Sequence, residues 1–343
     1  MSLFFLLAGF FARMLLERRG VGGFILDRAK RIALPLVSFW PLVFGVIVAV
    51  LIWTAVRANG GADSPPPPPM TAQTFPLTHL WFLYVLLIFY AVALVLRGLV
   101  SLIDRGGAMR TRFVDPVVKW IAGPYAPLLL AAPVCAALYF QPNWMMWFGV
   151  PTPDTGLVPN NAALVAYGLA FGFGWLVNRQ IDILRGWSIR WRPNPIIGVA
   201  SAATCLSMVG AGPLLTPVEP GTEKLIYAAF YALAVWGWTL GLIGVAMRYL
   251  SSQSPVRRYL ADASYWIYIV HLPLVLALQA ALAPYAWPWF VKYPLILAVA
   301  FAIMLASYQV MVRHSFIGAM LNGRTPSKSD KPGGEASTAP APT

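Results

Sequence analysis

The chain alternates between long apolar runs and short polar stretches. Most of the apolar runs have about 17 to 25 residues, the length that an α-helix needs to cross roughly 30 Å of hydrocarbon. Within lipid, every backbone N–H and C=O group must be satisfied inside its own segment, which favours long helices. The pattern therefore predicts an all-α, polytopic bundle of about nine transmembrane helices. The expected spans are residues 2–16, 32–56, 79–100, 120–140, 161–177, 195–213, 225–247, 264–283 and 293–312.

The Lys and Arg residues are divided unequally between the two sides of this bundle. The chain has 25 of them, and the expected spans place all but three on the side of the first basic loop. Basic loops are retained in the cytoplasm, so this division predicts that the basic loops and the C-terminus are cytoplasmic. The three exceptions are Arg57, Lys224 and Lys292.

The sequence divides into a transmembrane domain, residues 1–322, and a C-terminal tail, residues 323–343. The tail is rich in Ser, Pro, Gly and Ala. This composition buries too little apolar surface to fold and predicts a disordered cytoplasmic segment.

Composition narrows the possible classes of function. Only 11% of the residues are charged and 59% are hydrophobic, which excludes an ordinary soluble domain. The net charge of +13 is spread over loops and helix ends, which indicates membrane topology and argues against a nucleic-acid partner. Cys135 and Cys205 lie in separate apolar runs without metal-site or redox spacing, so we expect no metal site.

The start of the chain departs from this topology. Residues 1–11 carry no Lys or Arg, although the predicted orientation places the N-terminus outside the membrane. A signal peptide would carry basic residues ahead of its apolar stretch. We therefore expect that a helix preceding residue 1 is missing from this chain.

The predicted span 264–283 contains a histidine about seven residues from its start, and ionisable side chains within the membrane are costly and often functional. Ser264, Tyr268 and His271 follow an i, i+4, i+7 spacing that places them on one helical face. Pro273 removes a backbone hydrogen bond and favours a kink. The stripe fits either packing between helices or a role in binding and catalysis, and the residues leave both interpretations open.

A second polar group opens span 79–100, at its outer end. His79, Trp81 and Tyr84 follow one another closely there. Aromatic and histidine side chains at this depth anchor a helix end at the interface. They also suit contact with a polar acceptor outside the membrane, and the residues do not decide between the two.

The densest charge in the sequence is Asp27-Arg28-Ala29-Lys30-Arg31, just ahead of span 32–56. On a helix, Arg28 and Arg31 project from one face. Guanidinium groups suit phosphate oxygens, because they present a planar, paired set of donors. From the residues alone we favour topological anchoring or contact with lipid headgroups over a phosphate-binding site.

Four segments are distinctive when they are taken in order: residues 4–11 (Phe-Phe-Leu-Leu-Ala-Gly-Phe-Phe), 28–35 (Arg-Ala-Lys-Arg-Ile-Ala-Leu-Pro), 79–83 (His-Leu-Trp-Phe-Leu) and 264–273 (Ser-Tyr-Trp-Ile-Tyr-Ile-Val-His-Leu-Pro). Their order and spacing resemble the acyltransferase 3 family. Their form is closest to the branch that contains the glucan biosynthesis protein C type. The resemblance covers roughly residues 2–312 of a family with ten helices, and residues 4–11 correspond to its second helix.

The resemblance implies a multi-pass O-acyltransferase of the bacterial inner membrane. Such an enzyme moves an acyl group, acetyl or succinyl, from cytoplasmic acyl-CoA to a hydroxyl group of an extracytoplasmic saccharide or glucan. Acyl-CoA is then a co-substrate and no cofactor is bound permanently. The implied partners are acyl-CoA, the carbohydrate acceptor and membrane lipids.

The resemblance also implies roles for residues on the donor side. Arg28 and Arg31 match an Arg-x-x-Arg pair that holds the phosphates of coenzyme A. His271 matches the histidine of a late Tyr-x-x-His-x-Pro pattern along the path of the acyl donor. Ser264 and Tyr268 share its helical face and are expected to contact the donor there.

On the acceptor side, His79 and Trp81 match the outer end where the acceptor approaches, and we expect Tyr84 to contact the substrate with them. The resemblance places the family's catalytic histidine on a first helix, which we expect to be missing from this chain. We expect a misplaced gene start. Otherwise His271 or His79 serves as the general base, or the chain is inactive.

Two other classes of function compete with the enzyme. A transporter or flippase for a lipid or saccharide usually shows internal repeats and a carboxylate near the middle of the membrane, and the sequence shows neither. An inactive, truncated relative of the enzyme is the other alternative.

Overall fold

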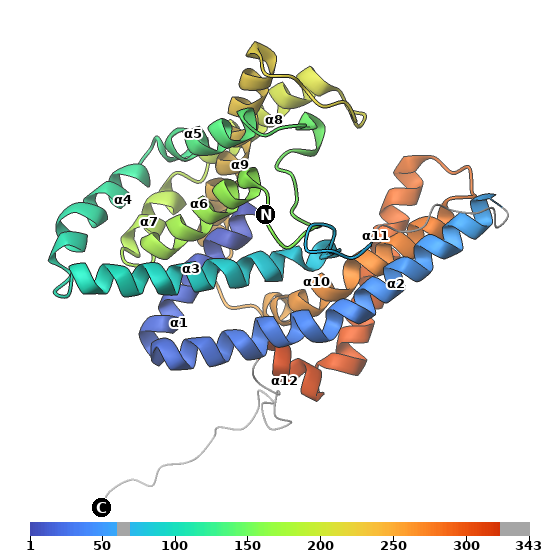
Figure 1. Cartoon of the computed structure of the whole chain (residues 1–343), viewed down its shortest axis with the longest axis horizontal. Coiled ribbons are helices and arrows are strands. Elements are labelled where there is room, and N and C mark those ends of the chain that lie inside the picture. The colour runs from blue at the N-terminus through green and yellow to red at the C-terminus, as the bar shows by residue number, and fades with distance from the viewer. Residues whose placement is uncertain (60–68, 323–343) are drawn as a thin grey trace, which may run out of the picture. The chain divides into compact units, whose positions relative to one another are not determined.

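The structure is a computed structural model that describes residues 1–59 and 69–322 (Figure 1). These residues form helices and loops with no β-strand among them, which confirms the predicted all-α class. Within them, π-helical segments η1 (Ala29–Ala33), η3 (Arg110–Val114) and η5 (Tyr308–Val312) and 3₁₀ turns η2 (Thr78–Leu80) and η4 (Met146–Phe148) lie next to α-helices. The α-helices are α1 (Ser2–Arg28), α2 (Leu34–Asn59), α3 (Trp81–Ile103), α4 (Asp115–Ile121), α5 (Ala126–Tyr139), α6 (Asn161–Val177), α7 (Asp182–Ile189), α8 (Pro193–Val209), α9 (Thr222–Tyr249), α10 (Pro255–Leu282), α11 (Trp289–Ser307) and α12 (Phe316–Asn322).

The described chain divides into two compact units. The first contains the described residues of Met1–Leu36 and Pro65–Ser254, and the second those of Val37–Ser64 and Pro255–Thr343. The prediction of one transmembrane domain over residues 1–322 stays a prediction. The predicted disordered tail, residues 323–343, lies outside the described residues.

Long apolar helices confirm that the chain is a multi-pass membrane protein. Among the described residues, five segments are long and apolar enough to cross a membrane, and two bent helix pairs raise the number to seven. The first segment, Ser2–Arg57, has 56 residues, far more than the roughly 20 that one span needs. The helix α8 is apolar but shorter. The predicted total of nine spans stays a prediction.

A break at Gly20 divides α1 into two helical parts. Gly20 has φ 67° and ψ 179°, a conformation that residues with a side chain rarely adopt. The part before the break contains the predicted span 2–16. The part after it continues through η1 into α2, so the break separates the first two predicted spans.

Two details of the predicted spans are wrong. The run 120–140 is not one helix, because α4 and α5 meet at a bend of 93°. Pro124 lies in the break, and proline disfavours a helical conformation of the residue before it. Residues 178–194, which the pattern predicts as a loop, contain α7. Ile183 and Trp187 are four residues apart and buried, and they hold this short helix against the rest of the first unit, mainly α9.

Direct backbone contact joins α1 to α6 in the first unit (Figure 1). A Cβ atom at Gly9 would meet the carbonyl oxygen of Phe171, and one at Gly174 would meet that of Leu6. Small residues permit this close approach between membrane helices. The helices α1 and α6 therefore form a tightly fitted frame, against which α3 packs.

In the second unit, α10 packs along α11. The indole Nε1–H of Trp266 donates a hydrogen bond to Ser307 Oγ at 3.0 Å. The ring of Phe39 on α2 meets Trp266 edge-on, with centroids 6.0 Å apart. Trp266 is two residues from both Ser264 and Tyr268, so these contacts hold the side of α10 that points away from the predicted histidine stripe.

Candidate functional site

A buried carboxylate organises the basic segment at the end of α1. The Asp27 side chain is 4% exposed and pairs with Arg19 (Nη1–Oδ1 3.1 Å), Arg31 (Nε–Oδ1 3.4 Å) and Arg28 (Nε–Oδ2 3.9 Å). These four residues are termed the Asp27 cluster. One carboxylate shared by three guanidinium groups leaves an excess of positive charge, which attracts anions.

Aromatic rings hold Arg28 in place within this cluster. Its guanidinium carbon lies 5.5 Å from the ring centroid of Phe24 and 5.1 Å from that of Tyr90. Its Nε atom is buried and has no hydrogen-bond acceptor among the described residues. The stacking fixes the plane of the guanidinium group, as planar recognition of a phosphate requires.

A second basic region borders a cavity of about 630 Å³, which lies between α1, α3, η3 and α6 in the first unit. The volume falls within the roughly 300–1,000 Å³ typical of ligand pockets. The residues that the sequence predicts as site residues do not line it. Its walls are mainly apolar, with Ile88, Phe89, Val92, Ala93, Leu96 and Val100 from α3, and Leu164, Gly168, Phe171, Gly172 and Trp175 from α6.

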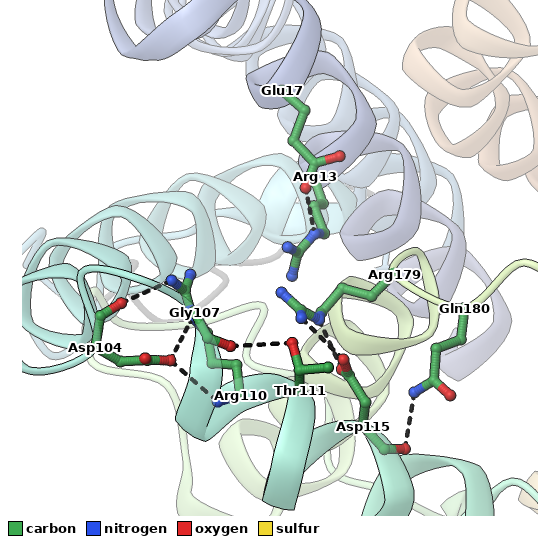
Figure 2. Close-up of polar contacts among 9 residues, drawn as sticks. All are labelled: Arg13, Glu17, Asp104, Gly107, Arg110, Thr111, Asp115, Arg179 and Gln180. Atoms are coloured by element: carbon green, nitrogen blue, oxygen red, sulfur yellow. Dashed lines mark hydrogen bonds and ion pairs between the residues drawn. The ribbon is translucent and has the colours of Figure 1, made fainter.

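Arginines form the polar end of this cavity, and carboxylates fix three of them (Figure 2). Each of these three has a carboxylate of its own, in contrast to the Asp27 cluster. The six residues, termed the cavity cluster, pair as Arg13 with Glu17 (2.8 Å), Arg110 with Asp104 (2.9 Å) and Arg179 with Asp115 (2.7 Å).

Arg97 also lines the cavity, from α3. In the part of the chain that the structure describes, it forms no ion pair with a carboxylate. Four arginines at the cavity therefore face three carboxylates, and the polar end carries one net positive charge.

The π segment η3 directs two members of the cavity cluster. Arg110 and Asp115 are five residues apart, and in an α-helix such residues point about 140° away from each other. In η3 the backbone N–H of Asp115 donates to the carbonyl oxygen of Arg110, which closes a π turn and brings the two residues toward one face. Arg179 donates Nε–H and Nη2–H bonds to the Asp115 carboxylate, and Arg110 pairs with Asp104 (Figure 2).

The carboxylate of Asp104 closes the turn between α3 and η3. It accepts hydrogen bonds from the backbone N–H groups of Met109 (3.2 Å) and Arg110 (3.0 Å), and from Arg110 Nε (2.9 Å). Burial opposes ionisation of this carboxyl group, but the hydrogen bonds and charge of Arg110 hold its pKa below the ordinary value. Asp104 is therefore ionised at neutral pH and fixes the Arg110 guanidinium at the cavity.

A polar pocket of about 490 Å³ adjoins the cavity where α4 and α7 approach each other. Arg179 lines both spaces, so it stands at the boundary between the apolar cavity and the polar pocket. Lys119 and Arg190 add further positive charge to the pocket. Arg190 is held in place because its Nη2 donates to the Ala122 carbonyl at 3.0 Å.

The predicted acceptor-side residues stay together at the start of α3. His79 lies in η2, directly before Trp81, the first residue of α3. Trp81 is 5% exposed and its ring stacks on Tyr167 with centroids 5.4 Å apart. Tyr84 donates its hydroxyl hydrogen to the Leu157 carbonyl at 2.9 Å. The expected contact of these residues with a substrate stays a prediction.

The predicted donor-side stripe lies in α10, in the second unit. His271 Nδ1 is 2.7 Å from the carbonyl oxygen of Tyr268. A carbonyl only accepts, so Nδ1 of the neutral ring carries the proton and Nε2 carries the lone pair that a general base uses. Ser264 donates its hydroxyl hydrogen to the Ala261 carbonyl at 2.7 Å. The roles of Ser264, Tyr268 and His271 stay predictions.

The structure thus brings Arg28 and Arg31 to one carboxylate, whereas Ser264, Tyr268 and His271 belong to the other unit. Sequence reasoning missed the cavity cluster, because it assigned these arginines to membrane topology. Asp115 and Arg179 are 64 residues apart and give no local signal. The i, i+4 spacing of Arg13 and Glu17 does give one.

Comparison with known protein families identifies the class. A family model described as an acyltransferase domain, that of the acyltransferase 3 family, matches residues 1–309. The match covers most of the chain, which therefore belongs to this family and is a membrane protein with an acyltransferase domain. No curated protein and no solved structure matches the chain.

Proposed function

We propose that this chain is an O-acyltransferase of the glucan biosynthesis protein C type in the bacterial inner membrane. It moves an acetyl or succinyl group from cytoplasmic acyl-CoA to a hydroxyl group of an extracytoplasmic saccharide or glucan. Membership of the acyltransferase 3 family supports acyl transfer in general. The observation that carries the choice of donor is the Asp27 cluster, with its three arginines around one carboxylate.

Coenzyme A carries several phosphate groups, and the Asp27 cluster suits such a polyanion. Its net positive charge remains after Asp27 is neutralised, and the side chains of Arg19 and Arg31 are 55% and 35% exposed. Arg28 is preoriented by its two aromatic neighbours. Charge-assisted bonds from Arg28 and Arg31 to phosphate oxygens are stronger and more specific than those from a flexible lysine.

The transfer step needs a base and a stabilised oxyanion. Nε2 of His271 accepts the proton of the acceptor hydroxyl, whose oxygen attacks the carbonyl carbon of the thioester. The C–S bond then breaks, and the coenzyme A thiolate leaves and takes up that proton. Tyr268 donates its hydroxyl hydrogen bond to the oxyanion formed in between. His79, with Trp81 and Tyr84, contacts the saccharide at the outer end.

Binding of acetyl-CoA and succinyl-CoA to membranes that contain the full chain tests the donor assignment. The double variant Arg28→Ala/Arg31→Ala loses two charge-assisted phosphate contacts, and we expect binding at least about tenfold weaker. The control Arg18→Ala/Lys30→Ala removes two exposed charges from the same segment and should bind normally. Equal binding by both double variants would overturn the assignment.

Transfer of the radiolabelled acyl group to a glucan oligosaccharide tests the reaction itself. The wild-type chain should label the oligosaccharide, and His271→Gln should lower the rate without weakening acyl-CoA binding. Movement of unmodified oligosaccharide across the membrane, without labelling, would favour the transporter instead.

A further inference from the structure

The cavity between α1, α3 and α6 is a site of its own, because Arg28 and Arg31 do not line it. We propose that it binds an anionic phospholipid, with an acyl chain inside the cavity and the phosphate against the arginines at its polar end. The apolar walls, the net charge and the neighbouring polar pocket each point to this class of ligand.

The walls suit an acyl chain that enters from the side. Val92 and Leu96 line the cavity on α3 and are 47% and 55% exposed, so this part of the wall faces the hydrocarbon that surrounds a membrane helix. On α6, Gly168 and Gly172 stand four residues apart and leave room where side chains would project. A Cβ atom at Gly172 would meet nothing within 4 Å.

The charge at the polar end matches a phosphodiester. Three arginines are fixed by their own carboxylates, and Arg97 supplies the remaining positive charge. A phosphodiester carries one negative charge and neutralises it. Because carboxylates already orient Arg110 and Arg179, the site needs little rearrangement when the phosphate binds.

The polar pocket beside Arg179 accommodates the headgroup of the phospholipid. It holds Lys119 and Arg190, and it lies at the junction of the short helices α4 and α7. Trp120 on α4 is 67% exposed, as expected for a tryptophan at the level of lipid headgroups. This end is the one predicted to be cytoplasmic, where anionic lipids attract basic residues.

Acyl-CoA suits this cavity less well. Its several phosphates would meet three arginines that are each paired with a carboxylate and are 14%, 30% and 19% exposed, whereas Arg19 and Arg31 share one carboxylate and are 55% and 35% exposed. The pairing and exposure of the arginines therefore match a different ligand at each site, one phosphodiester at the cavity and a polyphosphate at Asp27.

Native mass spectrometry of the full chain, titrated with dioleoyl phosphatidylglycerol or dioleoyl phosphatidylcholine, tests the headgroup contact. The wild-type chain should retain phosphatidylglycerol in preference to phosphatidylcholine. Arg97→Gln removes the uncompensated charge and should weaken retention of phosphatidylglycerol about tenfold. Arg105→Gln removes an exposed charge that does not line the cavity and should retain it normally. Equal retention by the two variants, or no preference in the wild type, would overturn the proposal.

A second pair of variants tests the acyl-chain contact. Gly172→Leu fills the cavity without meeting the backbone, and it should abolish the preferential retention. Gly45→Leu places the same side chain in open space elsewhere on a helix, and it should have no effect. Palmitoyl-CoA added as a competitor should leave the bound phosphatidylglycerol in place. Displacement by palmitoyl-CoA, lost in both Arg97→Gln and Gly172→Leu, would assign the cavity to the acyl donor and contradict the lipid.

Discussion

The Asp27 cluster and the cavity cluster use the same residue types in opposite ways. In the Asp27 cluster three arginines share one carboxylate, and in the cavity cluster each arginine has its own. Three arginines around one carboxylate leave the Asp27 cluster positively charged. One carboxylate for each arginine leaves the six residues of the cavity cluster neutral. The number of arginines therefore says little about the charge of a site. The distribution of the carboxylates decides it.

Exposure separates the two clusters as well. Arg19 and Arg31 are 55% and 35% exposed, which leaves them accessible to a dissolved polyanion. Arg13 and Arg179 are 14% and 19% exposed and lie against apolar walls. The first arrangement suits a water-soluble ligand and the second an amphiphile. The following four experiments test the difference in pairing between the two clusters.

The largest effect is expected at the shared carboxylate. Asp27→Asn leaves three guanidinium groups without their common counter-charge, one of them half-buried between aromatic rings. We expect the free energy of unfolding to fall by about 3 kcal/mol, as when one partner of a buried ion pair is removed. Thermal unfolding of the purified chain in detergent measures it. Asp182→Asn, at an exposed position, is the control, and equal melting temperatures would contradict the shared role.

A smaller loss of stability is expected at Asp115, which pairs with a single arginine. Asp115→Asn removes the charge that holds Arg179 through two hydrogen bonds, but it leaves a single arginine uncompensated. We expect a loss of about 1.5 kcal/mol in the free energy of unfolding. The same melting experiment, run beside Asp27→Asn, provides the comparison. A greater loss of stability in Asp115→Asn than in Asp27→Asn would contradict the idea that Asp27 matters because three arginines share its carboxylate.

Arg28→Lys separates charge from geometry in the Asp27 cluster. The charge stays, but the planar group stacked on Phe24 and Tyr90 is lost. We expect acetyl-CoA to bind about fivefold more weakly, because an ammonium group lacks the paired donors of a guanidinium. Lys30→Arg is the matched control at an exposed neighbour. Unchanged affinity in Arg28→Lys would mean that charge alone holds the donor.

The smallest effect concerns pH at the cavity cluster. The pKa of Asp104 is held below its ordinary value in the folded chain, so its ionised form stabilises the fold above about pH 4. That stabilisation is lost as the pH falls through the lower, folded-state pKa. The difference in melting temperature between wild type and Asp104→Asn should be constant from about pH 7 to pH 5 and shrink below about pH 4. A difference that persists unchanged at pH 3 would contradict it.

Much of the fold follows from the sequence where the signals are local. The helix α6 has the bounds predicted from its apolar run, and Asn160 caps it by accepting a hydrogen bond from the Ala163 backbone at 2.8 Å. The bend between α4 and α5 was missed because the apolar run continues through it, and hydropathy does not register the effect of Pro124 on the backbone. The burial of α7 depends on contacts with distant helices, which the pattern of residues 182–189 does not specify.

The two clusters show the same limit for the site. Arg28 and Arg31 lie within one turn of Asp27, so their common face could be predicted from spacing alone. Arg179 meets Asp115 across 64 residues, and their pairing depends on how α6 and α4 are placed by the fold. Local spacing therefore indicates which arginines can share the Asp27 carboxylate. Ion pairs between residues of separate helices can be identified only from the three-dimensional structure.

The π segment η3 has a consequence for the length of the chain at this point. A π turn accommodates one more residue than the α-helical turn that would otherwise stand there. Deleting one residue from 111–114 would therefore restore α-helical winding and leave Arg110 and Asp115 four residues apart, about 40° from each other, since each residue of an α-helix rotates it by about 100°. Asp115 would keep its direction toward Arg179, although the segment was one residue shorter. Relatives aligned with a single-residue gap in this segment are therefore expected to keep the Asp115–Arg179 pair, whereas α-helical winding without the gap would turn Arg110 and Asp115 about 140° apart.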